Sequence, residues 1–195
     1  TFNFEDPDND AIGQHISWEA TQDTGSNFLS EKLKKVSNGY KVSSTNYLKV
    51  VAWSFFLIGL NYLVLSSIEF YLNPRKTMSF MEGGKLFFTS GGPFVIIGLF
   101  LLLATATKLI IHVRKRHIHI GSDTLSFRDI YALQLLRKFI QGHKTGGYHC
   151  YELNIVTTTG ERYNVLNHGD KDYILSDMAK LSTIFKVPVW NRGVI

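Results

Sequence analysis

Two long apolar stretches without a charged residue constrain this chain more than any other feature. Val50 to Ile68 spans 19 residues, and Leu86 to Thr107 spans 22. Ordinary soluble domains, disordered chains and collagen-like chains do not carry such stretches. About 150 residues lie outside them, which is enough for one small domain rather than two. We therefore expect membrane helices combined with one small folded domain.

The length of the two stretches predicts a transmembrane hairpin. An apolar helix of about 20 residues crosses a hydrocarbon core of about 30 Å. We predict two spans, at about residues 50–71 and 92–112, joined by a short link in which Asn73-Pro74 and Gly83-Gly84 favour turns. The spans are then antiparallel neighbours.

Two strongly polar residues, an amide and a carboxylate, lie in the first predicted span. Asn61 is near its middle and Glu69 near its end. Polar groups inside a membrane are costly and commonly pair with a neighbouring helix. We therefore expect Asn61 to bond the second span near Thr105 or Thr107, or to bond a partner's helix.

Lysine and arginine gather at the outer ends of the predicted hairpin. Lys49 and four earlier lysines precede the first span, and Arg114, Lys115 and Arg116 follow the second. Because basic flanks resist translocation, both termini are expected on the cytoplasmic side. Lys49, Arg114, Lys115 and Arg116 are also candidate contacts for anionic lipid head groups, each contributing about 1 kcal/mol.

Charge is unevenly distributed along the chain, whose formal net charge is +5. The first 30 residues hold six acidic residues and no lysine or arginine. A basic membrane protein meets anionic lipid before nucleic acid, so nucleic acid is not expected as a partner. The start of the acidic arm, residues 1–17, has few large apolar groups and fits a segment that orders on binding. The single cysteine, Cys150, excludes an internal disulfide and a cysteine-based zinc cluster.

The segments outside the hairpin read mainly as strands. Asn38-Gly39 divides two short runs within residues 28–44, which is the strongest local signal for a β-hairpin with a type I′ turn. Five further strands are predicted at residues 114–120, 124–128, 130–140, 148–157 and 162–166, although residues 130–140 also fit a helix. Asp170 can cap a final helix that runs to Phe185, because apolar residues recur on one face.

These elements predict a membrane α + β protein in four parts. They are an acidic arm (1–27), a β-hairpin (28–46), the transmembrane hairpin (47–112) and a β-rich domain with a C-terminal helix (113–195). About seven strands closed by one helix is the outline of a pleckstrin-homology-like (PH-like) domain. The membrane hairpin is then inserted between its second and third strands.

Several short motifs resemble a family of largely uncharacterised bacterial inner-membrane proteins with two spans and a β-rich, PH-like cytoplasmic domain. The motifs are Trp18, Gly25-Ser26-Asn27-Phe28, Ala132-Leu133-Gln134-Leu135, Tyr151-Glu152-Leu153-Asn154, Asn164-Val165, His168-Gly169 and Pro188-Val189-Trp190. The resemblance covers most of the chain from Trp18 onward. It implies a bacterial inner membrane and brings no catalytic residues. Asn167 stands where that family usually has an aspartate, which weakens acid chemistry there.

Three histidines lie close together in the sequence. His117 and His119 are two residues apart on a predicted strand and face the same way, and His112 precedes them. Two imidazoles can begin a metal site, but no cysteine or carboxylate stands at a spacing that completes it. We interpret the histidines as part of the basic strip around Arg114, Lys115 and Arg116, and expect neither a metal nor another cofactor.

No other motif predicts catalysis. His168 with Asp170 and Asp172 could form a base and its orienting acid, but no activated serine or cysteine matches them. The segment 167–170 is better explained as a turn between a strand and a helix. The glycines of residues 142–147, with Lys144, lack the residue order of a phosphate-binding P-loop.

The sequence therefore leads to three hypotheses. The first is a non-enzymatic inner-membrane accessory or scaffold protein whose cytoplasmic domain binds a protein partner, a second copy or anionic lipid. The alternatives are an immunity-type protein that neutralises a membrane-directed toxin, and a subunit of a small oligomeric channel or transporter.

Overall fold

The computed structural model describes residues 4–72, 80–141 and 146–192 and divides the chain into two compact units. One unit consists of Thr1–Ser43 and Thr107–Ile195, and the other of Ser44–Ala106. The helical unit is therefore an insertion between two strands of a single β-rich unit, as the sequence predicted. Asn73-Pro74 and Lys144 lie outside the described residues.

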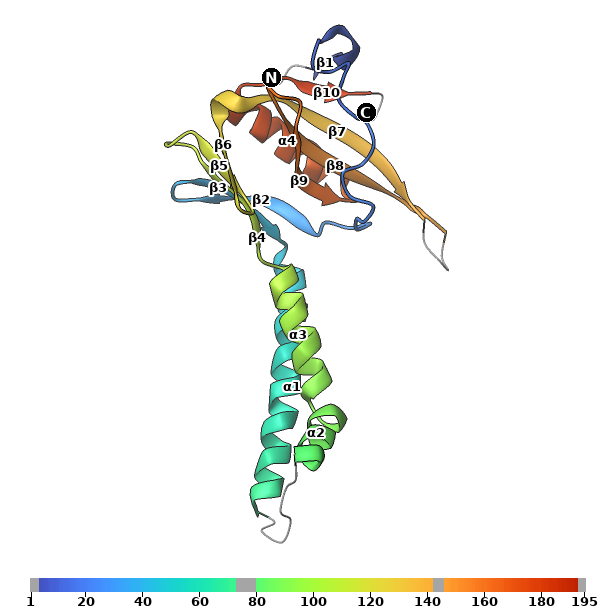
Figure 1. Cartoon of the computed structure of the whole chain (residues 1–195), viewed down its shortest axis with the longest axis vertical. Helices are drawn as coiled ribbons and strands as arrows, with labels where there is room; N and C mark the ends of the chain where they lie inside the picture. Colours follow the sequence, from blue (N-terminus) through green and yellow to red (C-terminus); the bar gives the residue numbers. More distant parts are fainter. Residues whose placement is uncertain (1–3, 73–79, 142–145, 193–195) are drawn as a thin grey trace. The chain divides into compact units, whose positions relative to one another are not determined.

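The helical unit contains one long apolar helix and a bent pair of shorter ones (Figure 1). They are α1 (Asn46–Leu72), α2 (Phe80–Thr89) and α3 (Gly92–Ala104). α1 is long and apolar enough to cross a membrane, and the pair Met81–Thr89 and Gly92–Ala104, bent by 65°, would add a second crossing only as a broken span.

The second predicted span, 92–112, is wrong in its C-terminal third. α3 ends at Ala104, because the backbone N–H of Thr105 bonds the carbonyls of the last helical turn and its hydroxyl donates to Leu102 at 2.9 Å. Residues 107–112 then form a strand. The 13 residues of α3 span only about 20 Å, short of a bilayer core.

Glycines let α1 and α3 approach closely. A Cβ at Gly98 would lie 2.4 Å from the Phe56 backbone nitrogen, and a Cβ at Gly59 would lie 2.6 Å from the Gly91 carbonyl oxygen. Phe55 and Phe94 stack across the pair with ring centroids 6.0 Å apart. The two helices therefore pack backbone to backbone, as small residues at a helix interface permit.

The β-rich unit contains two five-stranded sheets. Sheet B has the order β2 (Glu31–Val36), β3 (Gly39–Ser44), β4 (Thr107–His112), β5 (His117–Ile120) and β6 (Asp123–Ser126). Sheet A has the order β1 (Phe4–Glu5), β10 (Val189–Asn191), β7 (Ile130–Ile140), β8 (Tyr148–Thr157) and β9 (Arg162–His168). Two 3-10 helices, η1 (Pro7–Asn9) and η2 (Phe127–Asp129), complete the connections.

The seven predicted strands all form, and the segment 130–140 is a strand rather than a helix. The count of seven is wrong, because the described residues also include β1, β4 and β10, which makes ten. β1, at the edge of sheet A, and β10, between β1 and β7, pair in parallel and have two and three residues, too few to show a periodic pattern.

The β2–β3 hairpin is confirmed, but its turn lies one residue earlier than predicted. The turn residues are Ser37 and Asn38, and Gly39 opens β3. Among described residues other than glycine, only Arg116 and Lys186 have positive φ, so Asn38 does not adopt the type I′ conformation.

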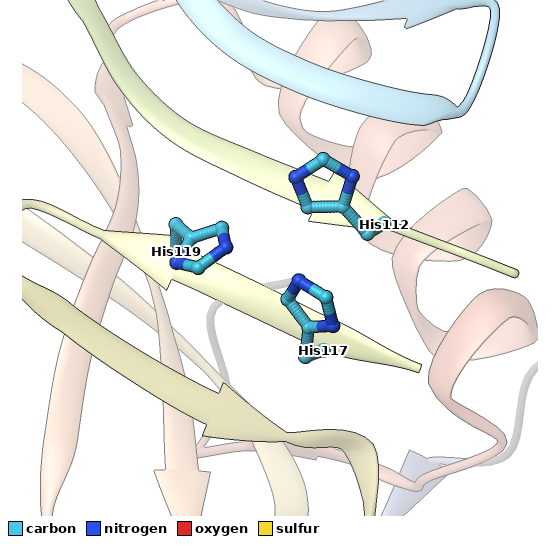
Figure 2. A group of neighbouring side chains, drawn as sticks. All are labelled: His112, His117 and His119. Carbon is cyan, nitrogen blue, oxygen red and sulfur yellow. The ribbon is translucent and has the colours of Figure 1, made fainter. Parts of the chain in front are cut away.

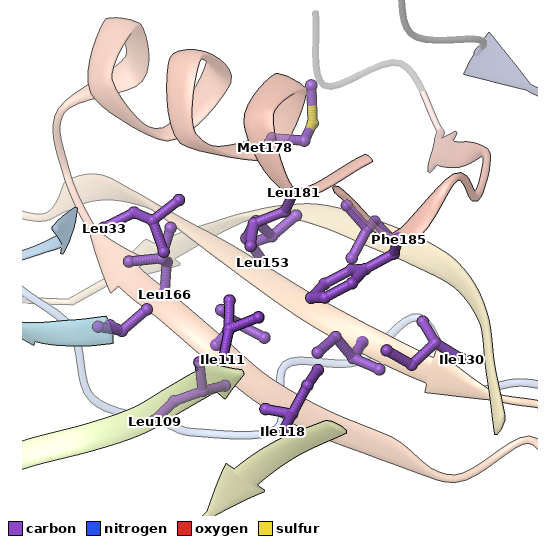
Figure 3. Close-up of a cluster of buried hydrophobic side chains, with 14 of the residues drawn as sticks. Leu33, Leu109, Ile111, Ile118, Ile130, Leu153, Leu166, Met178, Leu181 and Phe185 are labelled. Carbon is purple, nitrogen blue, oxygen red and sulfur yellow. The ribbon is translucent and has the colours of Figure 1, made fainter. Parts of the chain in front are cut away.

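A single apolar core joins the two sheets to α4 (Lys171–Phe185). Asp170 caps α4 by accepting from the backbone N–H of Tyr173 at 3.1 Å, as predicted. Figure 3 shows Leu181 and Phe185 of this helix beside side chains from both sheets, among them Ile118 and Leu153, and Met178 belongs to the same buried cluster. This core fixes β4 and β5, and with them the side chains on their other face.

Candidate metal centre

Alternation along β4 and β5 separates an apolar face from a polar one. Leu109, Ile111 and Ile118 are buried in the core. His112, His117 and His119 stand at the intervening positions and so project from the opposite face of sheet B. His112 was expected at the end of a helix, and its place on a strand is what changes the interpretation of this segment.

The strand register gathers the three histidines. His112 lies directly opposite His117, and Ile110 lies opposite His119, so His119 is the diagonal neighbour of His112. The ring centroids are 4.8 Å apart for His112 and His117, 5.3 Å for His112 and His119, and 4.8 Å for His117 and His119. Figure 2 shows the three rings converging on one another.

One ring nitrogen of each histidine can serve as a ligand. These nitrogens all lie within 4.8 Å of one another. A tetrahedral metal with bonds of about 2.0–2.1 Å needs neighbouring nitrogens about 3.3 Å apart. His112 and His117 are only half-buried, so modest side-chain rotations can close this gap.

A hydroxyl on the adjacent strand orients one ring. Thr124 lies opposite His119 in the register of β5 and β6, and its Oγ1 is 2.8 Å from His119 Nδ1. When Nδ1 carries the proton and donates to this hydroxyl, Nε2 keeps its lone pair for a metal. The contact is the kind of outer hydrogen bond that accompanies metal-bound histidines.

The local electrostatics favour neutral imidazole. Partial burial lowers the pKa of His112, and the nearby His117, His119 and Lys115 lower it further. Neutral imidazole is the form that binds metals. The lowered pKa of His112 therefore favours the form in which its ring can act as a ligand.

The basic residues predicted to meet lipid fall in two different units. Arg114, Lys115 and Arg116 are exposed in the turn between β4 and β5, and Arg116 has a φ of 53° and accepts a bond from the Phe127 backbone N–H at 3.0 Å. Lys49 is half-buried in the first turn of α1. Because α3 ends at Ala104, the strand β4 separates these turn residues from the helix.

The polar residues predicted within the first span are exposed on α1. Both Asn61 and Glu69 face outward. Within the described residues no hydrogen bond joins Asn61 to Thr105 or Thr107, and the Thr105 hydroxyl bonds its own helix at Leu102. Glycines meet between α1 and α3 instead, and the alternative expectation, a bond from Asn61 to a partner's helix, stays a prediction.

His168 is buried, and the contact of its ring is structural rather than catalytic in kind. Its Nδ1 accepts from the Asp170 backbone N–H at 3.2 Å, and burial lowers its pKa. Asp170 caps α4, and Asp172 is exposed in the first turn of that helix. The turn between β9 and α4 is therefore shorter than the predicted 167–170, because Asn167 and His168 belong to β9 and only Gly169 and Asp170 connect it to α4.

The sequence reasoning missed a buried polar cluster beneath the acidic arm. Glu152 is fully buried, and its carboxylate lies 2.9 Å from Lys138 Nζ and 2.8 Å from the Thr21 backbone N–H. The arm is not left free, because Asp10 accepts from the Tyr131 hydroxyl at 2.7 Å and Ile16 is buried. The sequence did contain a pattern for this cluster, because Cys150, Glu152 and Asn154 alternate along β8. A polar face of a strand usually indicates exposure to solvent, so the pattern did not predict burial.

Comparison of the chain with protein-family models, with curated proteins and with solved structures finds no match.

Proposed function

We propose that this chain is a membrane-anchored, non-enzymatic accessory protein whose β-rich unit binds a divalent transition metal through His112, His117 and His119. The convergence of these three side chains from two paired strands carries the proposal. Three imidazoles with an open fourth position suit zinc, copper, nickel or iron rather than magnesium or calcium, which prefer oxygen ligands.

The anchor in this proposal is α1, with or without the bent pair. Its side chains are mostly exposed, and its most apolar 18-residue window is only 11% buried. The lysines before α1 and the basic turn after β4 support a cytoplasmic β-rich unit at a bacterial inner membrane. The fourth metal position and the surrounding surface are then available to a partner.

Calorimetric titration of the purified full chain in detergent tests metal binding. Wild type is expected to take up one equivalent of Zn²⁺ or Ni²⁺, with heat signals that vanish in chelator. His117→Ala and His112→Ala should each weaken affinity by about a hundredfold or more, because two imidazoles cannot replace three.

His149→Ala is the matched control, since His149 is an exposed strand histidine outside the cluster. It should bind metal as wild type does. Stoichiometric binding that survives both cluster substitutions, or its absence from wild type, would contradict the proposal.

A second candidate function rests on the exposed turn of Arg114, Lys115 and Arg116. Three adjacent cations on one turn can hold an anionic lipid head group. Phosphatidylglycerol added to the detergent solution should then raise the unfolding temperature of wild type more than that of Arg114→Gln/Lys115→Gln. The control is Lys171→Gln, an exposed lysine on α4, and an equal rise in all three proteins would exclude this role.

A further inference from the structure

The face of sheet A that points away from the core is polar yet covered. Cys150, Glu152 and Asn154 alternate on β8 with core residues and are fully buried. The strand register places Gln134 and Asn164 beside Asn154. A covered sheet face is ordinarily apolar, because burying polar groups is costly unless each is hydrogen-bonded. The residues that cover this one supply those bonds.

Side chains of sheet A bind the main chain of residues 17–25, and we call these side chains the arm groove. The donors and the carbonyl oxygens that they reach are Gln134 to Ser17 (3.0 Å), Arg162 to Glu19 (2.8 Å), Lys138 to Gln22 (2.6 Å) and Thr24 (2.9 Å), Asn167 to Thr24 (2.7 Å) and Tyr148 to Gly25 (2.7 Å). The arm groove thus binds this segment mainly through the carbonyl groups of the segment's main chain.

Glu152 completes the groove as an acceptor. Its carboxylate receives the Thr21 backbone N–H at 2.8 Å, the Thr21 hydroxyl at 2.7 Å, Asn154 Nδ2 at 2.8 Å and Lys138 Nζ at 2.9 Å. Burial alone would raise the pKa of Glu152, but these hydrogen bonds outweigh burial and lower it. The buried ion pair of Lys138 and Glu152 therefore receives several of its hydrogen bonds from the arm, which takes the place of water.

Few side chains of the arm take part in this contact. Glu19 and the four residues from Thr21 to Thr24 are exposed. The sequence requirements fall on Ile16, which is buried beside Trp18, and on the Thr21 hydroxyl. They also fall on Gln22, whose side-chain oxygen accepts from Asn167 Nδ2 at 2.9 Å, and on Gly25, where a Cβ would lie 2.4 Å from Cys150 Sγ. The arm of a second copy of this chain meets all of them.

Charge also matches the arm to its groove. The arm carries only acidic charges, whereas Lys138 and Arg162 line the groove and Arg192 pairs with Asp8 beyond it. The groove also keeps internal bonds that do not involve the arm. Asn154 donates to Gln134 at 3.3 Å and accepts from Asn164 at 3.1 Å.

We propose that the arm groove binds residues 17–25 of a second copy of this chain in exchange for its own. Each contact described above is made by atoms that an identical arm supplies equally well, so the exchange needs no new complementarity. Asn27 and Phe28, which link the arm to β2, have exposed side chains. The exchange does not depend on the metal site.

A labelled peptide of residues 15–27 stands for the second copy's arm in the test. The protein is the full chain carrying Thr21→Pro, which removes the backbone N–H and the hydroxyl that bind Glu152 and so loosens its own arm. Fluorescence anisotropy should show the peptide binding this variant at least tenfold more tightly than wild type, whose groove is occupied. Thr21→Val, which keeps the N–H, is a milder second variant if Thr21→Pro alters the circular dichroism of the fold.

Altered peptides separate recognition of the arm from unspecific adhesion. A peptide with Asp23→Ala should bind as the native one does, because that side chain is exposed. A peptide with Thr21→Pro should not bind. Equal affinity of the native peptide for wild type and variants, no binding to either variant, or equal binding of a scrambled peptide would overturn the proposal.

Discussion

The helical unit and the β-rich unit use the same apolar residues in opposite ways. Leu57 of α1 is 54% exposed, whereas Leu153 of β8 is fully buried. In α1 the buried residues are Ala52 and Gly59, so the helix contacts its neighbour through its smallest side chains and presents its large ones outward. The β-rich unit instead buries its large apolar side chains in a closed core. The helical unit thus exposes the kind of side chain that the β-rich unit buries, which fits the proposed membrane anchor.

Truncation of a leucine in each unit tests this contrast with the largest expected effect. Leu153→Ala should lower the free energy of unfolding of the β-rich unit by about 2–5 kcal/mol, because it leaves a cavity in a closed core. Leu57→Ala should cost less than about 0.5 kcal/mol, as exposed substitutions do. Denaturant titration in detergent, followed by fluorescence, measures both, and similar losses would break the comparison.

A methyl group added to the helical unit has a smaller expected effect. Gly98→Ala places a Cβ against the Phe56 backbone and should destabilise the packing of α1 on α3 by about 1–3 kcal/mol. Gly84→Ala is the control, because its Cβ meets nothing within 4 Å. The fluorescence of Trp53, which lies on α1, reports this unit. A neutral Gly98→Ala would show that the glycines do not hold the helices together.

Mild acid should lower the unfolding free energy of the β-rich unit but not that of the helical unit, and this is the smallest of the expected effects. Burial lowers the pKa of His168, so the folded protein binds fewer protons than the unfolded chain below pH 6.5. The β-rich unit should therefore lose up to about 1.4 kcal/mol per pH unit for this proton as pH falls below 6.5. Residues 44–106 contain no histidine, so the helical unit should not respond.

His168→Asn keeps an acceptor for the Asp170 N–H and removes the titrating ring. The lowered pKa of His112 also makes the folded protein less stable as pH falls. Metal-free His112→Ala is therefore measured beside His168→Asn to separate the two contributions. Unfolding free energies at pH 7 and pH 5.5 should differ less in His168→Asn than in wild type. An unchanged difference would locate the proton uptake elsewhere.

Local patterns in the sequence predict much of the β-rich unit. The strand Tyr148–Thr157 and the helix from Asp170 to Phe185 have the predicted bounds, since alternation and capping act over a few residues. The sequence did not predict β4, because its apolar residues continue the apolar run of α3. The pairing of β4 with β3 and β5 decides its conformation. The sheet positions of β1 and β10 likewise depend on partners far away in the sequence.

The candidate metal centre was missed for the same reason. His117 and His119 were correctly placed on one face of a strand, but His112 was assigned to a helix. Its position opposite His117 follows from the register of β4, which no local pattern reveals. The arm groove also needed tertiary information, because the residues that cover Glu152 lie 131 positions earlier.

X-ray absorption spectroscopy of the full chain loaded with one equivalent of Zn²⁺ tests the central proposal most directly. The proposal predicts scattering from three imidazoles at about 2.0 Å. His117→Ala should lose one of them, whereas His149→Ala should keep all three. A spectrum with no imidazole, or with one in both wild type and His117→Ala, would contradict a metal centre formed by His112, His117 and His119.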